Sequence, residues 1–295
     1  MARLIRRSLL GAGLVGAAGM VAWGGWRWRT SGSGLLDFAY GTDPRQTLDI
    51  WLPQGKGPFP LVVDIHGGAF RVGDKADTPP SPQVLAAGIA VVRVNYRLTD
   101  TAIWPAQGKD CLAAVAWLQQ TGAAHRLDPA RIALWGQSAG AFLAVSTALS
   151  MTEMGMPPKG VVSFYAPTDF STEDADMAAL GRTAAMGQAD GADSPESTLL
   201  GYAVASDRVA ARAMGPVGRL DAWQGPLPPI LIRHGDADPM ISDLQARRLR
   251  DAWLKADPGA EVDYALVAGA GHGGGGFEKA EVMGPTVAFL QRVLG

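Results

Sequence analysis

One serine of this chain lies in a pentapeptide whose residue types suit nucleophilic chemistry. Ser138 is the centre of G-Q-S-A-G at residues 136–140, a G-x-S-x-G pattern. The apolar run 131–135 is typical of a buried strand, and the apolar and small residues 141–149 are typical of a packed helix. Glycines on both sides leave room for a sharp strand-to-helix turn that exposes the serine hydroxyl. We therefore predict that Ser138 is a nucleophile; the alternative is a glycine-rich turn with an incidental serine.

A serine hydroxyl is a poor nucleophile unless a base lies within hydrogen-bond reach and a third group orients that base. The histidines available as this base are His66, His125, His234 and His272. His272 lies in a glycine-rich loop after the predicted strand 262–267, and we predict that it is the base. Asp236 and Asp238 follow the predicted strand 229–233, and each could orient the imidazole. The alternative for both aspartates is an exposed turn, because Asp-x-Asp-Pro is also favourable turn chemistry.

Backbone N–H donors are predicted beside the serine. The sequence H-G-G-A-F at residues 66–70 follows the predicted strand 61–65. Consecutive glycines allow backbone N–H groups to approach a developing oxyanion, and we predict this role for Gly67 and Gly68, together with Ala139 after the serine. In this interpretation His66 supports the loop and is not the base. The alternative is an ordinary glycine-rich turn.

The elements that must position these residues alternate between strands and helices. The predicted strands are residues 61–65, 89–95, 131–135, 160–165, 229–233 and 262–267, and the predicted helices are residues 81–88, 105–122, 141–149, 243–256 and 278–294. This alternation indicates βαβ crossovers and a mainly parallel sheet with helices on both faces. The alternating patterns at 37–40 and 46–52 predict an antiparallel, half-exposed edge. Because the carboxyl ends of parallel strands share one edge, the serine, the histidine and the aspartate loop should meet there.

Residues 169–225 interrupt this alternation. They contain several acidic residues, short helical fragments rich in alanine and methionine, and Ser194-Pro195-Glu196, a helix N-cap pattern. A segment of this length is too long for a simple crossover between two strands. We predict an inserted, lid-like helical segment that covers the site and shapes its pocket.

Composition is that of a globular chain with a sizeable core. Of the 295 residues, 47% are hydrophobic and 18% are charged. The formal net charge of −2 offers no electrostatic basis for binding nucleic acid. Cys111 is the only cysteine, which excludes an intrachain disulfide and predicts a buried apolar role. The glycines at 273–276 lack the spacing of a phosphate-binding loop.

The first thirty residues have the composition of an export signal. A basic start with the pair Arg6-Arg7, followed by Ser-Leu-Leu and an uncharged run, resembles a twin-arginine signal. Tryptophans interleaved with arginines come next, a combination typical of membrane interfaces. We predict an exported protein, periplasmic or secreted, organised as an export signal or N-terminal membrane anchor at 1–30, a linker at 31–36 and a catalytic domain at 37–295.

The ordered motifs of the chain resemble the α/β-hydrolase superfamily, in the branch shared by hormone-sensitive-lipase-like esterases and bacterial feruloyl/acetylxylan (BD-FAE-like) esterases. The motifs that carry the resemblance are H-G-G-A-F at 66–70, N-Y-R-L at 95–98, W-G-Q-S-A-G at 135–140, Y-A-P-T-D at 165–169, S-P-E-S at 194–197, H-G-D-A-D-P at 234–239 and G-A-G-H-G at 269–273. The P-T-D and S-P-E-S matches favour the feruloyl/acetylxylan group. Gln137 replaces an acidic residue and Ala69 replaces a third glycine, and both departures weaken the match to the lipase-like group.

The resemblance implies a Ser138–Asp238–His272 triad, since the second aspartate of the family's histidine-glycine motif is the acid. It further implies an esterase that needs neither a metal nor an organic cofactor, and whose partner is a small-molecule ester. An amidase, formamidase or peptidase could use the same triad, and a non-catalytic binding protein could keep the same scaffold. Acyl and alcohol specificity and the oligomeric state are not readable from these residues.

Overall fold

The structure is a computed structural model, and it describes residues 34–295. The predicted export signal or anchor at 1–30 and the first part of the linker lie outside the described residues, so they stay predictions. Between residues 34 and 295, no helix combines the length and the apolar character needed to cross a membrane.

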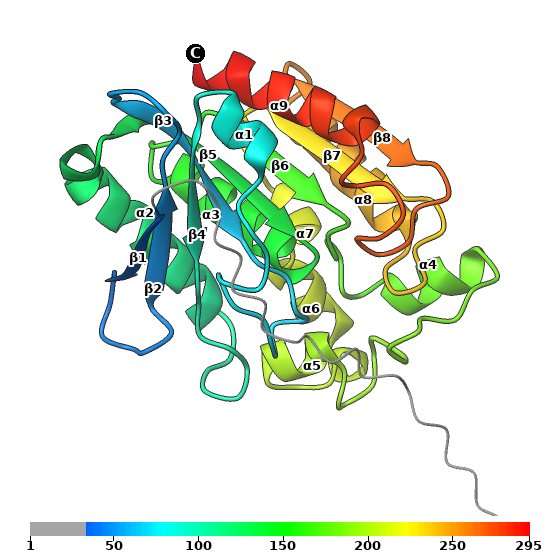
Figure 1. Cartoon of the computed structure of the whole chain (residues 1–295). Helices are drawn as coiled ribbons and strands as arrows, with labels where there is room; N and C mark the ends of the chain where they lie inside the picture. The colour runs from blue at the N-terminus through cyan, green and yellow to red at the C-terminus, as the bar shows by residue number, and fades with distance from the viewer. Residues whose placement is uncertain (1–33) are drawn as a thin grey trace, which may run out of the picture.

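An eight-stranded sheet runs through the described part of the chain in the order β1-β2-β4-β3-β5-β6-β7-β8 (Figure 1). The strands are β1 (Gly34–Ala39), β2 (Thr47–Trp51), β3 (Phe59–Ile65), β4 (Ala90–Val94), β5 (Leu127–Gln137), β6 (Val161–Phe164), β7 (Ile230–Gly235) and β8 (Val262–Val267). Strands β3 to β8 pair in parallel, whereas β2 pairs antiparallel with both β1 and β4. The predicted mainly parallel sheet with an antiparallel edge is therefore confirmed.

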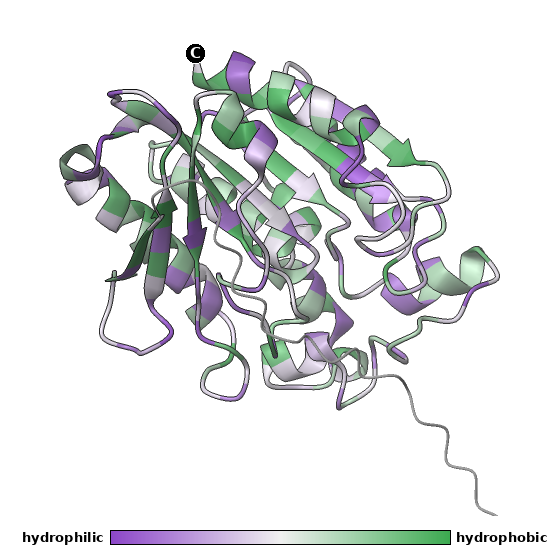
Figure 2. Cartoon of the chain, in the orientation of Figure 1, coloured by the Kyte–Doolittle hydropathy of each residue, from purple (hydrophilic) through white to green (hydrophobic). Residues whose placement is uncertain are grey.

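Helices cover both faces of this sheet, as predicted. Helices α1 (Pro82–Ala86) and α9 (Ala280–Leu294) pack on one face, and α2 (Ala106–Thr121), α3 (Ala139–Glu153) and α8 (Asp243–Ala256) pack on the other. A short 3₁₀ turn, η1 (Gly122–His125), follows α2. Hydrophobic and hydrophilic residues succeed one another along α9 in Figure 2, and its apolar residues face the sheet.

The two cores follow from the two-residue period of the strands. In β3, Leu61, Val63 and Ile65 lie in the core beneath α2, α3 and α8, whereas Val62 lies in the core beneath α1 and α9. All four side chains are fully buried. Central strands covered on both faces are therefore apolar almost throughout, which is why short hydrophobic runs in the sequence predicted them.

Between β6 and β7 the chain leaves the sheet and forms a helical excursion. Its elements are α4 (Glu173–Ala179), α5 (Pro195–Leu200), the 3₁₀ turn η2 (Val204–Ser206), α6 (Arg208–Met214) and α7 (Pro216–Leu220). The predicted N-cap is present, because Ser194 Oγ accepts a hydrogen bond of 3.0 Å from the Ser197 N–H. Helices α4, α5 and α6 lie beyond the strand ends to which the arrowheads point (Figure 1), while α7 packs against α3 and α8.

Candidate active site

Ser138 occupies the turn between strand β5 and helix α3. The strand ends at Gln137 and the helix begins at Ala139, so a single residue connects them. Its φ of 54° and ψ of −125° are strained for a residue with a side chain. Both elements are longer than their predicted apolar cores, and the sharp strand-to-helix turn is present where it was predicted.

Glycine is required on both sides of this turn because backbone segments approach closely. A Cβ atom on Gly136 would lie 2.0 Å from the carbonyl oxygen of Gly140, and one on Gly140 would lie 2.0 Å from the carbonyl oxygen of Ile65. No side chain can be accommodated at such distances, so the two glycines allow β3, β5 and α3 to converge at the serine.

Ser138, His272 and Asp238 form one chain of contacts. Ser138 Oγ lies 2.8 Å from His272 Nε2, and His272 Nδ1 lies 2.7 Å from Asp238 Oδ2. The three residues follow strands β5, β8 and β7, so the parallel sheet brings them to one edge. Asp238 is fully buried, while the His272 side chain is 11% exposed. Such an arrangement can move a proton from a hydroxyl to an imidazole whose tautomer is held by a carboxylate.

The Asp238 carboxylate is compensated on both oxygens. Oδ1 accepts hydrogen bonds of 2.8 Å from the Met240 N–H and 3.0 Å from the Ile241 N–H. Burial by itself raises the pKa of Asp238, but hydrogen bonds from His234 and His272 outweigh that effect and hold the pKa well below its usual range. The carboxylate is therefore charged at neutral pH.

His234 is a second histidine on the same carboxylate, and sequence reasoning assigned it no role. Its Nε2 lies 3.2 Å from Asp238 Oδ2 and 3.0 Å from the Ile241 carbonyl oxygen. Because both neighbours are acceptors, Nε2 carries the proton. The ring is fully buried, and its Nδ1 has no partner among the described residues. The feature of the sequence that could have indicated this contact is the position of His234 at the end of β7, four residues before Asp238.

Asp236 is not part of this contact chain. Its Oδ1 accepts a 2.7 Å hydrogen bond from the Gly269 N–H, and its own carbonyl accepts a 2.6 Å bond from Arg182. It therefore ties the loop that carries His272 to the loop after β7. Of the two aspartates that could orient His272 by residue type and position, Asp238 is the one that contacts it.

The loop after β3 lies against the serine. A Cβ atom on Gly67 would come within 3.3 Å of Ser138 Cβ, and Gly68 has a φ of 110° that favours glycine. Within residues 34–295, the N–H groups of Gly67, Gly68 and Ala139 are bonded to no acceptor. Three N–H donors, in the loop beside Ser138 and in the residue after it, thus have no acceptor in the described part of the chain.

His66 is built into the base of this loop. Its Nδ1 lies 2.7 Å from the Gly67 carbonyl oxygen, and its ring stacks on Tyr96 at a centroid distance of 4.4 Å. Burial and the nearby Arg45 guanidinium lower the pKa of His66 to about 4, while the Gly67 carbonyl opposes them. The ring is therefore neutral at physiological pH and contacts the loop backbone rather than Ser138.

A cavity of about 390 Å³ opens over Ser138. Gly67, Gly68 and Ala139 line it together with His272, and three residues of the excursion also contribute to the wall: Met186, Pro195 and Glu196. Tyr165 also lines the cavity; its hydroxyl donates a 2.8 Å hydrogen bond to Gln137 Oε1, and its ring packs on the edge of His272.

The remaining candidates lie elsewhere. His125 stacks on Trp117 at a centroid distance of 5.5 Å and takes no part in the contacts among Ser138, His272 and Asp238. Cys111 is buried, as predicted, and burial raises the pKa of its thiol far above the usual range. It is therefore an inert core residue.

Comparison with solved structures supports the fold. A truncated carbohydrate esterase from gut microbiota superposes with a TM-score of 0.75 at 23% identity, covering 88% of this chain and 96% of that chain. A bacterial heroin esterase superposes with a TM-score of 0.66 at 22% identity, covering 90% of this chain and 84% of that chain. At such identities the likeness concerns the α/β-hydrolase fold alone.

Sequence comparison finds relatives that are named as esterases. Carboxylesterase NlhH of Mycobacterium tuberculosis is 29% identical over 266 residues, which is 83% of this chain and 77% of NlhH. Esterase LipQ of the same species is 27% identical over 252 residues and 80% of this chain. The chain spans only 56% of the length of LipQ.

The family model named BD-FAE matches residues 48–253, which reach from strand β2 to helix α8 and include Ser138 and Asp238. This match extends over more than half of the chain. The chain belongs to the BD-FAE family of α/β-hydrolase esterases.

Proposed function

We propose that this chain is a serine carboxylic-ester hydrolase in which Ser138 is the nucleophile, His272 the general base and acid, and Asp238 the group that orients His272. The single observation that carries the proposal is the continuous contact from Ser138 Oγ to His272 Nε2 and from His272 Nδ1 to Asp238 Oδ2, at 2.8 and 2.7 Å. Membership in a family of esterases supports the same reaction.

In the first half-reaction, Ser138 Oγ attacks the ester carbonyl carbon while His272 Nε2 takes the hydroxyl proton. The carbonyl oxygen becomes an oxyanion, and the free N–H groups of Gly67, Gly68 and Ala139 stabilise it. Collapse of the tetrahedral intermediate breaks the carbon–oxygen bond to the alcohol, which leaves with the proton from His272. The product is an acyl-serine ester.

In the second half-reaction, water attacks the acyl-serine carbonyl while His272 takes one of its protons. The bond to Ser138 Oγ then breaks, His272 returns the proton to the serine, and the carboxylic acid leaves. Asp238 stays ionised throughout and stabilises the imidazolium that forms in each half-reaction. Every proton is accounted for by these three residues and water, so the mechanism requires no cofactor.

Substrates are proposed to be small esters with short-chain or acetyl/feruloyl-type acyl groups. The cavity over Ser138, about 390 Å³, is in the range of pockets for small molecules. The excursion acts as a lid-like wall, since Met186, Pro195 and Glu196 line the cavity. An amidase or formamidase could use the same residues, but the relatives are named as esterases, which favours ester substrates.

Residues 1–30 are proposed to export the protein, with or without remaining as an anchor. The proposal rests on the arginine pair and the uncharged run that follows it. Cell fractionation of the full chain tests it, and Arg6→Lys with Arg7→Lys is the matched variant. Accumulation of both proteins in the cytoplasm in equal amounts would contradict export.

Ser138→Ala tests the proposed activity most directly. Hydrolysis of p-nitrophenyl acetate should fall by about 10⁶-fold in kcat, because the nucleophile is removed. Only the wild-type chain should be labelled by a fluorophosphonate probe. Matched ester and formamide substrates then separate an esterase from an amidase. Full turnover by Ser138→Ala would contradict the assignment of Ser138 as the nucleophile.

A further inference from the structure

Two buried glutamates, one in the wall of the Ser138 cavity and one in a smaller cavity beside it, have no role in the proposed mechanism. Glu196, on α5, lines the Ser138 cavity; Glu173, at the start of α4, lines the smaller cavity of about 30 Å³ next to it. The two cavities share Glu196, Met186 and Met240 as walls. Relative exposures are 5% for Glu173 and 6% for Glu196. The smaller cavity is thus a side chamber of the site.

Neither glutamate has a cationic partner in the part of the chain that the structure describes. No ion pair joins Glu173 or Glu196 to another side chain within residues 34–295, and Glu173 Oε1 is buried without any hydrogen-bond partner. The Glu196 backbone N–H, the Arg71 charge and the Ser194 hydroxyl all act on the Glu196 carboxyl, but the Arg71 guanidinium is itself bonded to the Asp193 carbonyl and the Thr198 hydroxyl. A buried carboxylate left in this way is costly, and such groups concentrate at binding sites.

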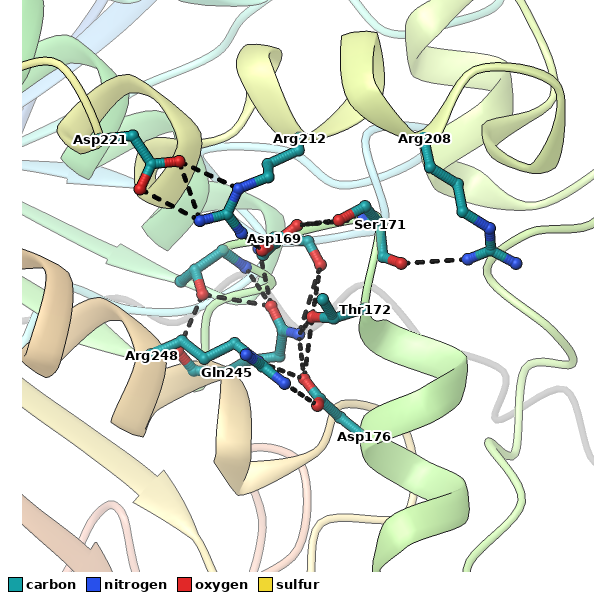
Figure 3. Close-up of polar contacts among 10 residues, drawn as sticks. Asp169, Ser171, Thr172, Asp176, Arg208, Arg212, Asp221, Gln245 and Arg248 are labelled. Atoms are coloured by element: carbon teal, nitrogen blue, oxygen red, sulfur yellow. Dashed lines mark hydrogen bonds and ion pairs between the residues drawn. The ribbon is translucent and has the colours of Figure 1, made fainter.

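The other acids of the excursion are compensated. Figure 3 shows Arg212 bonded to Asp169 and Arg248 bonded to Asp176, the latter at 2.5 and 2.9 Å. Asp174, which also lines the side chamber, accepts hydrogen bonds of 2.8 and 3.0 Å from the N–H groups of residues 189 and 190. Among the buried acids of the excursion, as far as residues 34–295 show, only Glu173 and Glu196 therefore lack an ion pair.

We propose that Glu173 and Glu196 form a binding site for a positively charged ammonium group on the ester substrate, and that the three methionines around them (Met177, Met186 and Met240) receive the adjoining methylene groups. A chamber of about 30 Å³ has room for a group of the size of an ammonium ion. Charge-assisted hydrogen bonds from N⁺–H donors would satisfy the free Glu173 oxygen. This inference rests on the proposed ester hydrolysis.

The burial of Glu173 and Glu196 agrees with their assignment as an ammonium-binding site. Burial and the Glu196 charge raise the pKa of Glu173, and burial raises the pKa of Glu196 to about 7. In the empty site the two carboxyls can share a proton, which a bound ammonium would displace. Binding should therefore strengthen as the pH rises from about 6 to about 8.

Matched esters test the proposal. Ethyl 6-aminohexanoate is compared with its uncharged isostere ethyl heptanoate, and 6-aminohexyl acetate with heptyl acetate, so that the acyl and alcohol arms are distinguished. Wild-type kcat/KM should favour the charged ester of one pair by about tenfold or more. Glu196→Gln and Glu173→Gln should bring both ratios of kcat/KM, charged ester over its uncharged isostere, to about one. Asp193→Asn, an exposed acid of the same excursion, should change neither.

A binding measurement separates failure of this inference from failure of the proposed activity. Saturable binding of n-butylammonium chloride to Ser138→Ala, followed by NMR at pH 8, should be lost when Glu196→Gln is added; 1-butanol and sodium chloride are the controls. Two results would contradict the ammonium site but not the proposed ester hydrolysis. One is hydrolysis of all four esters with equal kcat/KM for the charged and uncharged ester of each pair; the other is the absence of saturable n-butylammonium binding. Binding without hydrolysis of any ester would overturn the esterase instead.

Discussion

Two groups of buried acids in this molecule have opposite surroundings. Asp169 and Asp176, 0% and 3% exposed, are held by arginines and by Gln245, whose side chain lies between them (Figure 3). Glu173 and Glu196 are buried almost as deeply, in the same excursion, but they have no ion pair within residues 34–295. The first group fastens the excursion to helix α8. In the second group, Glu196 lines the cavity over Ser138 and Glu173 lines the smaller cavity beside it.

Burial alone therefore does not decide what a carboxylate does. Asp238 is the extreme compensated case, since two histidines and two backbone N–H groups keep it charged although it is fully buried. Glu196 is the opposite case, since burial prevails and its pKa rises to about 7. Compensated acids stabilise the fold or orient a neighbour, and uncompensated acids are available to a ligand.

Removing the charge of the most compensated acid should have the largest effect. Asp238→Asn is expected to lower kcat for a short-chain ester by about 10⁴-fold, because the amide cannot hold the His272 tautomer or stabilise its charged form. Circular dichroism should report an unchanged fold, since Oδ1 can still accept from Met240 and Ile241. An activity loss of less than tenfold would place the orienting acid elsewhere, with Asp236→Asn as the first comparison.

Disrupting the compensated group should cost stability. Gln245→Ala removes the amide that accepts from the N–H groups of Thr168 and Asp169 and donates to Asp176. Leaving these buried groups without partners should lower the free energy of unfolding by about 3 kcal/mol. Urea titration measures this, and Lys255→Ala, exposed on the same helix, should stay within about 0.5 kcal/mol. Equal effects of the two variants would contradict the anchoring role.

Neutralising an acid of the uncompensated group should raise the free energy of unfolding, which is the opposite of the change expected for Gln245→Ala. Because the pKa of Glu196 is higher in the folded chain than in the unfolded chain, the folded state binds its proton more tightly. Wild-type stability should therefore fall as the pH rises from about 4.5 to about 7. Glu196→Gln should flatten this slope and stabilise the chain by about 2 kcal/mol at pH 8, with little change near pH 4. A destabilised variant at pH 8 would show that the carboxylate has a partner.

The smallest of these effects is expected at His234. His234→Leu removes one donor to Asp238 Oδ2 and should lower kcat about tenfold with KM nearly unchanged, because Asp238 orients His272 less firmly. His234→Gln can place an N–H near the same oxygen and should recover part of the loss. If both variants lose kcat equally, the role of His234 is packing rather than positioning.

Much of the architecture could be predicted because its signals are local. Apolar runs covered on both faces identified the central strands, and glycines beside Ser138 identified the strand-to-helix turn. Chain order and loop position then selected His272. Residue types alone left Asp236 and Asp238 both open, since both are turn residues of one loop, and only the family resemblance favoured Asp238. In the structure Asp238 contacts the imidazole, whereas Asp236 bonds the Gly269 N–H.

Pattern and spacing along the chain were sufficient to predict the alternation of strands and helices, the turn at Ser138 and the residues that meet at the carboxyl edge of the sheet. Two features appear only in the folded chain: His234 shares the Asp238 carboxylate, and two glutamates of the excursion are buried in and beside the Ser138 cavity without an ion pair within residues 34–295. The physical reason is that pattern and spacing encode short-range conformation and apolar burial. Compensation of a buried charge depends instead on side chains that are distant in sequence and converge only in the folded chain.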